Sequence, residues 1–133
     1  MKSQFSNTWN SSVQPRKQRK FRYNAPMNVK RKFLTVNLVK ELREKHGARN
    51  AKIRKGDRVK VLRGNFKSKT GVVDKVDLGN LKVFVAGIEL SKKDGSKAKV
   101  PLNPTNLQIT ELKLDDKERK KKFTPSKKKA EDK

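Results

Sequence analysis

The distribution of charge constrains this chain more than any other feature of its sequence. Its 133 residues carry 37 Lys and Arg against 13 Asp and Glu, a formal net charge of +24. No acidic residue precedes Glu41, whereas ten basic residues do. Because like charges repel one another in a compact domain, this surplus indicates a polyanionic partner. Nucleic acid is the strongest candidate, since each Lys or Arg that neutralises a phosphate releases condensed counterions.

The composition also limits how much of the chain can form a core. Only 32% of the residues are hydrophobic and 38% are charged, which is too little apolar material to bury the whole chain. We therefore expect a compact centre of about half the residues, with arms that become ordered on the partner. Cysteine is absent, which excludes disulfides and thiolate metal sites and fits a reducing compartment.

Membrane insertion is not expected, because no apolar run approaches the roughly 20 residues that a membrane helix needs. The first dozen residues are polar and lack the apolar core of a signal peptide. An anionic membrane surface is a weaker alternative to nucleic acid. Proline, asparagine and serine interrupt the basic stretches, whereas a surface-bound helix needs a broad apolar face.

Residues 1–25 are predicted to form an extended basic arm. A run of basic residues is followed closely there by Phe21 and Tyr23. Lys and Arg can neutralise phosphates while an aromatic ring stacks on an exposed base. For the two aromatics, packing on the domain is an equally good interpretation. The candidate RNA-binding residues of this arm are Arg16, Lys17, Arg19, Lys20 and Arg22.

Residues 26–50 are predicted to form short helices. Pro26 suits a helix start, and the following turns would end near residue 33. A second helix would begin at Asn37 as N-cap and stop at Gly47. His46, the single histidine, would cap the end of this helix or contact a phosphate. The candidate RNA-binding residues of this region are Lys30, Arg31 and Lys32.

Residues 51–112 change to a period of two, which indicates half-buried strands. We expect strands over 57–61, 70–76, 81–85, 97–102 and 107–112, and a further one from Ile88. Asp94-Gly95 predicts a type I′ hairpin turn. Short strands joined by tight turns favour a mainly β domain closed into a small barrel. Its predicted core is Val59, Val61, Val72, Val73, Val76, Leu81, Val83, Val85, Ile88, Leu107 and Ile109.

Residues 113–133 are predicted to form a basic C-terminal tail, disordered when alone. Asp115 and Glu118 resemble a capping box that could start a short helix through Lys122. A further basic cluster follows at residues 127–129.

The stretch 54–76 carries the most informative motif. A strand leads into a turn at Gly64, the turn displays Lys67 and Lys69, and Gly71 lets the chain enter the next strand without a side-chain clash. Cations on a stiff loop lose less entropy on binding than cations on a free tail, so phosphate is the natural target. Asn103 and Asn106 could bond sugars or phosphates, with capping of their own backbone as an equal alternative. The candidates of this region are Arg54, Lys55, Lys60, Arg63, Lys67, Lys69, Thr70, Asn103 and Asn106.

This stretch resembles the KOW motif. From about Gln14 to Phe123 the chain resembles the archaeal and eukaryotic branch of the universal large-subunit ribosomal protein twenty-four family. The resemblance rests on residues 14–20, 24–26, 38–43, 94–95 and 103–107 around the KOW stretch. One departure is Ser68, where the family commonly carries glycine.

The resemblance implies an SH3-like barrel bound to large-subunit ribosomal RNA near the mouth of the peptide exit tunnel. It implies binding early in subunit assembly, in the cytoplasm. Neighbouring ribosomal proteins, and nascent-chain factors at the tunnel exit, are the further partners that it suggests.

Two other classes of protein fit less well. A KOW module of a transcription elongation factor would dock on RNA polymerase, but the basic arm and tail argue against it. An enzyme is not expected, because one histidine, no cysteine and scattered carboxylates form no catalytic constellation. Asp57, Asp74 and Asp77 are interpreted as solvated turn carboxylates rather than metal ligands. No cofactor, metal or small-molecule substrate is therefore predicted.

Overall fold

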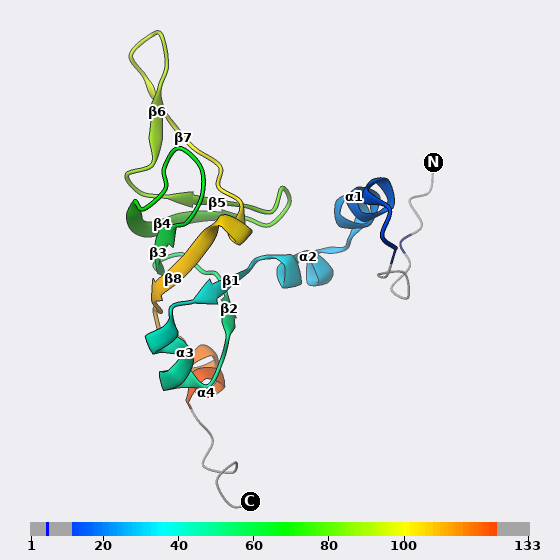
Figure 1. Ribbon diagram of the computed structural model, residues 1–133, viewed down its shortest axis with the longest axis vertical. Helices are drawn as coiled ribbons and strands as arrows, with labels where there is room; N and C mark the ends of the chain where they lie inside the picture. Colours follow the sequence, from blue (N-terminus) through cyan, green and yellow to red (C-terminus); the bar gives the residue numbers. More distant parts are fainter. Residues whose placement is uncertain (1–4, 6–11, 125–133) are drawn as a thin grey trace, which may run out of the picture.

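A six-stranded sheet forms the centre of the computed structural model, which describes Phe5 and residues 12–124 (Figure 1). The basic cluster expected at 127–129 lies outside the described residues. The strand order is β2-β1-β8-β3-β4-β5, and all pairs are antiparallel except β1 with β8. The strands are β1 (Thr35–Leu38), β2 (Asn50–Lys52), β3 (Arg58–Val61), β4 (Thr70–Asp77), β5 (Lys82–Val85) and β8 (Leu107–Glu111).

The predicted mainly β domain is present, but the closed barrel is not seen. Strands β2 and β5 are the two edges of the sheet in the described part of the chain. The outer edge of β5 is occupied instead by Leu102, whose backbone exchanges hydrogen bonds of 2.8 and 2.9 Å with Val83. Strand β2 is only three residues long, and a short edge is a common way to avoid pairing with another chain. Both edges are thus protected without closure.

A separate hairpin of β6 (Glu89–Ser91) and β7 (Lys97–Lys99) projects from the sheet (Figure 1). Its turn lies at the predicted place but is not type I′, which needs two residues with positive φ. Only Gly95 has positive φ there, at 85°, and its N–H donates to the carbonyl of Lys92 at 3.1 Å. This is a type I turn followed by a glycine bulge, which suits a three-residue loop.

The N-terminal arm is not extended from residue 15 onward, because helix α1 (Pro15–Asn24) occupies it. Pro15 begins this helix, where its missing N–H costs nothing, and most residues after it are good helix formers. The predicted short helix over 27–33 is confirmed as α2 (Met27–Phe33). Figure 1 shows α1 standing to one side of the sheet and α2 leading back to β1.

The predicted helix start at Asn37 is wrong. Residues 35–38 form β1, whose Leu38 is fully buried, and α3 (Lys40–His46) begins two residues later. The predicted stop at Gly47 is confirmed by its left-handed φ of 61°.

The C-terminal region is also not a simple tail. Helix α4 (Lys117–Phe123) packs on the domain and buries Arg119 and Phe123. Its N-cap is Asp116, one residue later than predicted, and the cap accepts a hydrogen bond from the N–H of Glu118 at 3.1 Å. His46 lies against this helix: its Nδ1 donates to the carbonyl of Phe123 at 2.8 Å, and the two rings meet edge to face. His46 therefore binds α4 rather than capping its own helix or facing a phosphate.

The core agrees with most of the predicted positions. Nine of the eleven are buried, whereas Val72 is 40% exposed and Val76 is only partly buried. Val72 and Val73 are neighbours on β4, so only one of them can face the core. The core also contains residues outside this predicted set, namely Leu34, Val36, Leu38, Ala51, Ile53, Leu102 and Phe123.

A buried ion pair joins α4 to the sheet. Asp57 is fully buried and Arg119 is 5% exposed, and the guanidinium meets the carboxylate through two hydrogen bonds of 2.7 Å. The carboxylate also accepts from the backbone N–H groups of Arg54 and Lys113. The guanidinium donates in addition to the carbonyls of Lys52 and Lys113. The interpretation of Asp57 as a solvated turn carboxylate is therefore wrong.

Replacing Arg119 by Ala should lower the free energy of unfolding by about 3–5 kcal/mol, because it leaves the Asp57 carboxylate buried without its counter-charge. Urea unfolding of the full chain measures the loss. Lys120→Ala is the matched control, since Lys120 lies next to Arg119 in α4 but is exposed. Equal losses in the two variants would show that the pair does not hold α4 in place.

Candidate nucleic-acid interface

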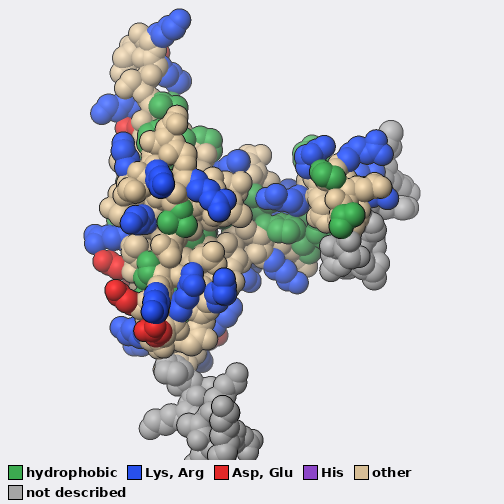
Figure 2. Space-filling view, in the orientation of Figure 1, with side chains coloured by type: hydrophobic (Ala, Val, Ile, Leu, Met, Phe, Trp, Pro, Cys, Tyr) green, Lys and Arg blue, Asp and Glu red, His purple; other side chains and the backbone are tan. Residues whose placement is uncertain are grey.

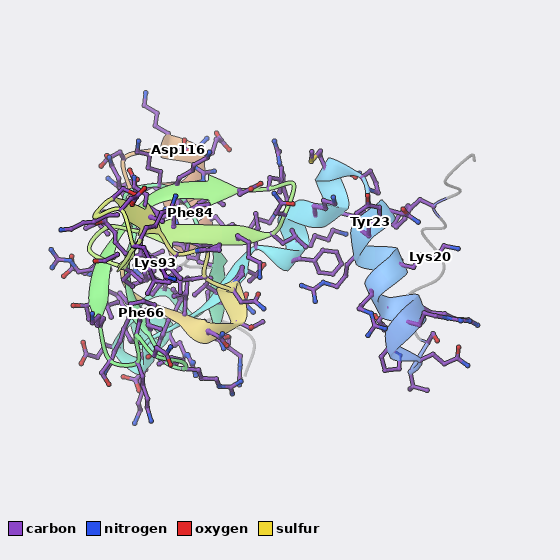
Figure 3. All side chains as sticks on the ribbon, turned by 90° about the horizontal axis from the view of Figure 1, so that it is seen from above. Lys20, Tyr23, Phe66, Phe84, Lys93 and Asp116 are labelled. Carbon is purple, nitrogen blue, oxygen red and sulfur yellow. The ribbon has the colours of Figure 1, made fainter. Side chains whose placement is uncertain are left out.

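Helix α1 presents a stripe of cations that ends in an aromatic ring. Arg16, Arg19, Lys20 and Tyr23 are spaced i, i+3, i+4 and i+7, so they share one helix face. All four are exposed, and Figure 3 shows Lys20 on the side of α1 away from the sheet. Since no acidic residue precedes Glu41, no carboxylate from this part of the chain can neutralise the stripe. We call these four residues the α1 stripe.

The other aromatic of α1 holds the helix in place. Phe21 lies 4.9 Å from Phe5 and 6.2 Å from Phe33 between ring centroids. The Arg22 guanidinium lies over the Phe33 ring at 5.6 Å. The sequence left packing and base stacking equally open for both aromatics. The structure separates them, because Phe21 packs whereas Tyr23 is 83% exposed.

The cations of α2 differ in their surroundings. Lys30 is half-buried, and its Nζ donates to the carbonyl of Gly79 at 3.1 Å, which ties α2 to the turn between β4 and β5. Arg31 and Lys32 are exposed in the last turn of the helix. Figure 2 shows blue side chains over α1 and α2 without any red, while the few red ones lie on the main body.

The loop between β3 and β4 forms a second group of cations. Hydrogen bonds from Ser68 N–H to the carbonyl of Val61, and from Val61 N–H to that of Lys69, close its base at 2.8 and 2.9 Å. The Lys69 ammonium lies 5.2 Å from the centre of the Phe66 ring. These contacts close the loop into a compact turn between β3 and β4. Its exposed candidates are Arg63, Lys67, Lys69 and Thr70, with Lys60 on β3 just before it.

Gly71 and Ser68 show how tightly this loop is built. A Cβ on Gly71 would lie 2.5 Å from the carbonyl oxygen of Ala86 and 2.6 Å from Val85 Cγ1, so only glycine fits there. Ser68 adopts φ of 70°, a left-handed conformation that glycine takes at no steric cost. The serine thus keeps the turn that glycine would form but strains its backbone.

Some of the other cations on the main body are already paired with carboxylates. Among the candidates this applies to Arg54, whose guanidinium binds Asp116 at 2.5 Å. Both residues are about half exposed. The hydrogen bond from Arg54 is the largest cause that holds the pKa of Asp116 below its usual value. Further pairs join Arg58 to Glu111, Lys99 to Asp74, Lys113 to Asp115 and Lys121 to Glu118.

A hydrogen bond to its cation also lowers the pKa of Asp74, as it does that of Asp116. The Lys99 hydrogen bond lowers the pKa of Asp74, and the same bond raises the pKa of Lys99. Each such carboxylate competes with phosphate for its cation. None of the other predicted RNA-binding cations has a carboxylate partner within ion-pair distance in the described chain. Arg54 is therefore the weakest of the predicted phosphate ligands.

Most of the predicted site residues fall into two groups, one on α1 and α2 and one on the β3–β4 loop. Lys30 and Asn103 join Arg19, Arg22 and Tyr23 around a cleft of about 750 Å³ beside the β4–β5 turn. Phe66 of the β3–β4 loop lies on the part of the main body away from Lys20 and Tyr23 (Figure 3). Lys55 lies apart from both, beside Asp74 and Lys75. A ligand that contacts both groups must be large.

The two asparagines flank a short 3₁₀ helix, η1 (Pro104–Asn106). Asn103 stands at its N-cap but makes no side-chain cap hydrogen bond, so the capping alternative is not seen for it. The backbone carbonyl of Asn106 accepts a hydrogen bond from the N–H of Leu62 at 2.8 Å, which joins the end of η1 to the chain just after β3. Sequence reasoning missed Asn24, Asn80 and Lys82, which also line the cleft. Asn24 is the last residue of α1, and nothing in the local sequence of Asn80 and Lys82 marks these two as neighbours of that helix.

Neither a metal site nor a membrane span is present in the part of the chain that the structure describes. Within residues 12–124 and Phe5, no group of His, Asp and Glu side chains could hold a metal ion. Of the helices in that same part, none is long and apolar enough to cross a membrane.

Comparison with known proteins gives one consistent result. Residues 12–125 match the family model that describes the L26 ribosomal proteins of eukaryotes and their archaeal L24 counterparts. The large ribosomal subunit protein uL24 of Methanocorpusculum labreanum is 51% identical over 106 residues, which cover 80% of this chain and 88% of that protein. The protein of the same name from Methanoculleus marisnigri is 48% identical over 112 residues, 84% of this chain and 93% of its own.

Ser68→Gly should raise the free energy of unfolding by about 0.5–1 kcal/mol, because it relieves the left-handed strain at a small entropic cost. Ser91→Gly is the control, since Ser91 is exposed in β6 and has no positive φ. It should instead lose stability, by a comparable amount. Thermal unfolding of both variants measures these changes in stability. If Ser68→Gly also lost stability, the backbone of Ser68 would not be strained.

Proposed function

Since the chain belongs to the family of eukaryotic L26 and archaeal L24 ribosomal proteins, we propose that it binds large-subunit ribosomal RNA through its unpaired cations. Membership in this family makes the chain a structural, non-enzymatic component of the cytoplasmic ribosome. The contact with RNA is our proposal, and the positions of the Lys and Arg side chains support it.

The observation that carries this proposal is the division of the surface cations. Within the described residues, those of α1, α2 and the β3–β4 loop have no carboxylate partner, whereas Arg58, Lys99, Lys113 and Lys121 each have one. A surface of unpaired cations repels itself unless phosphate neutralises it. The two groups lie at separate ends of the view in Figure 3, so one RNA that contacts both would have to extend along the domain.

Recognition would rest mainly on RNA shape. The candidate side chains are mostly Lys and Arg, which contact phosphate and sugar and carry little sequence information. Asn103 and Asn106 could add contacts to 2′-hydroxyls or base edges. The stiff β3–β4 loop would fix the register of the RNA on the sheet, because its cations lose little entropy on binding.

The proposal extends to early subunit assembly and to a position near the peptide exit tunnel. Both extensions are supported by the resemblance to the family and not by a contact within this chain. Neighbouring ribosomal proteins, and nascent-chain factors at the tunnel exit, would then be further partners. The alternative function, a polymerase-binding KOW module, has no support from the comparisons, which match ribosomal proteins.

Replacing Arg16, Lys17, Arg19 and Lys20 together by Ala should weaken binding to transcribed large-subunit RNA. It should also flatten the plot of log affinity against log salt by roughly one unit for each lost phosphate contact. The measurement is a filter-binding titration at several salt concentrations.

The matched control replaces Arg58, Lys99, Lys113 and Lys121 by Ala. It removes the same charge, but from residues that pair with carboxylates. Its slope should stay close to that of the unchanged protein. Equal flattening in the two variants would mean that net charge, and not the position of the unpaired cations, controls binding.

A further inference from the structure

The cleft beside the β4–β5 turn has a composition that favours one kind of ligand. Among the described residues that line it are Arg19 and Arg22 from α1, Lys30 from α2 and Lys82 from β5. None of its described lining residues carries a carboxylate. Its volume of about 750 Å³ lies within the usual range of small-molecule sites, about 300–1,000 Å³. An anionic ligand of moderate size therefore suits the cleft.

Tyr23 supplies a flat apolar surface at the edge of the same cleft. The ring is 83% exposed, and it stands at the end of the α1 stripe. A single exposed aromatic residue is common on protein surfaces. Here, however, the exposed ring lines a cationic cleft, and a stripe of cations leads directly to it. A polyanion that follows the stripe would arrive at the ring.

The opposite wall of the cleft is held rigidly. Asp77 accepts from the backbone N–H of Asn80 at 3.1 Å and from its side-chain amide at 2.9 Å. These bonds to Asn80 lower the pKa of the Asp77 carboxyl, so it remains ionised at neutral pH. Lys30 ties α2 to Gly79 in the same turn. A wall that is already ordered loses little entropy when a ligand binds.

Amide groups around the cleft can distinguish a base from a simple anion. Asn24, Asn80 and Asn103 all line it. Asn103 makes no cap hydrogen bond with its side chain. The side-chain amide nitrogen of Asn80 already donates to Asp77, which leaves its oxygen as an acceptor. Such groups hydrogen-bond the edges of an unstacked base.

We propose that this cleft receives one unpaired nucleotide of RNA, whose base stacks on Tyr23 while its phosphates meet Arg19, Lys30 and Lys82. The nucleotide is a bulge in a helix whose backbone follows the α1 stripe. This assignment rests on the RNA binding proposed above and adds to it a specific ligand, a base outside the helical stack. An acidic peptide would satisfy the cations but would leave Tyr23 and the amides without a role.

The test compares two RNA stem-loops of the same stem sequence. One carries a bulged 2-aminopurine, and in the other the 2-aminopurine is paired with uridine. The fluorescence of 2-aminopurine falls when the base stacks on an aromatic ring. The full chain should bind the bulged RNA about tenfold more tightly than the paired one, because only the bulged base is free to stack on the aromatic ring. It should also quench the bulged base.

Tyr23→Ala should abolish both the preference and the quenching, while its binding to the paired RNA keeps the same salt dependence. Tyr23→Phe retains a ring and should behave as the unchanged protein does. Met27→Ala is the control, because Met27 is 56% exposed on α2 and does not line the cleft.

Three results would overturn the nucleotide site. They are equal affinity for the two RNAs, a preference that survives in Tyr23→Ala, and an oligoglutamate peptide whose binding depends on Tyr23 more strongly than that of the bulged RNA. The absence of salt-dependent binding to either RNA would instead refute the proposed function itself.

Discussion

The buried pair of Asp57 and Arg119 is the interaction on which the rest of the domain depends. One carboxylate accepts from two backbone N–H groups and from the guanidinium, and that guanidinium reaches two carbonyls as well. The backbone partners lie at the end of β2, just before β3 and just after β8. The pair therefore fixes the point where three strands meet α4. A buried charge without its partner is costly, so α4 belongs to the fold and is not an appendage.

The pair also explains how such a basic chain folds at all. Its cations are of three kinds: Arg119 is buried and neutralised, several on the main body pair with surface carboxylates, and the remainder have no carboxylate partner in the described part of the chain. Surface pairs contribute little to stability, about 0–1 kcal/mol each. Their effect is to reduce repulsion where the domain is compact. These unpaired cations include those of α1, α2 and the β3–β4 loop, where phosphate from another molecule can reach them.

Much of the β domain could be predicted from the sequence, because alternation reports directly which side chains face a core. Strands β3, β5 and β8 follow this rule. The alternation rule fails at Val72 and Val73, because two adjacent apolar residues leave open which of them faces the core. Strand β1 was missed because Asn37, which lies inside it, also suits the N-cap of a helix. Asp57 was misread because its partner lies 62 residues away, in a run of lysines that looks solvated.

The candidate site was likewise predictable only where it depends on local sequence. The basic residues of α1, α2 and the β3–β4 loop were recognisable by type, since a local run of cations needs no tertiary information. The cleft was not, because it combines α1 and α2 with the β4–β5 turn and Asn103. Only the fold brings these segments together. Sequence reasoning left packing and stacking equally open for Phe21 and Tyr23, and the difference between them depends on the position of Phe33.

A cryo-EM map of the native large ribosomal subunit tests the central claim most directly, that unpaired cations of this domain face RNA and paired ones do not. Phosphates are expected within hydrogen-bonding distance of the α1 stripe and of the β3–β4 loop. Arg58, Lys113 and Lys121 should remain with their carboxylates. A map in which RNA lies against those paired residues, while the α1 stripe faces solvent or protein, would contradict the claim.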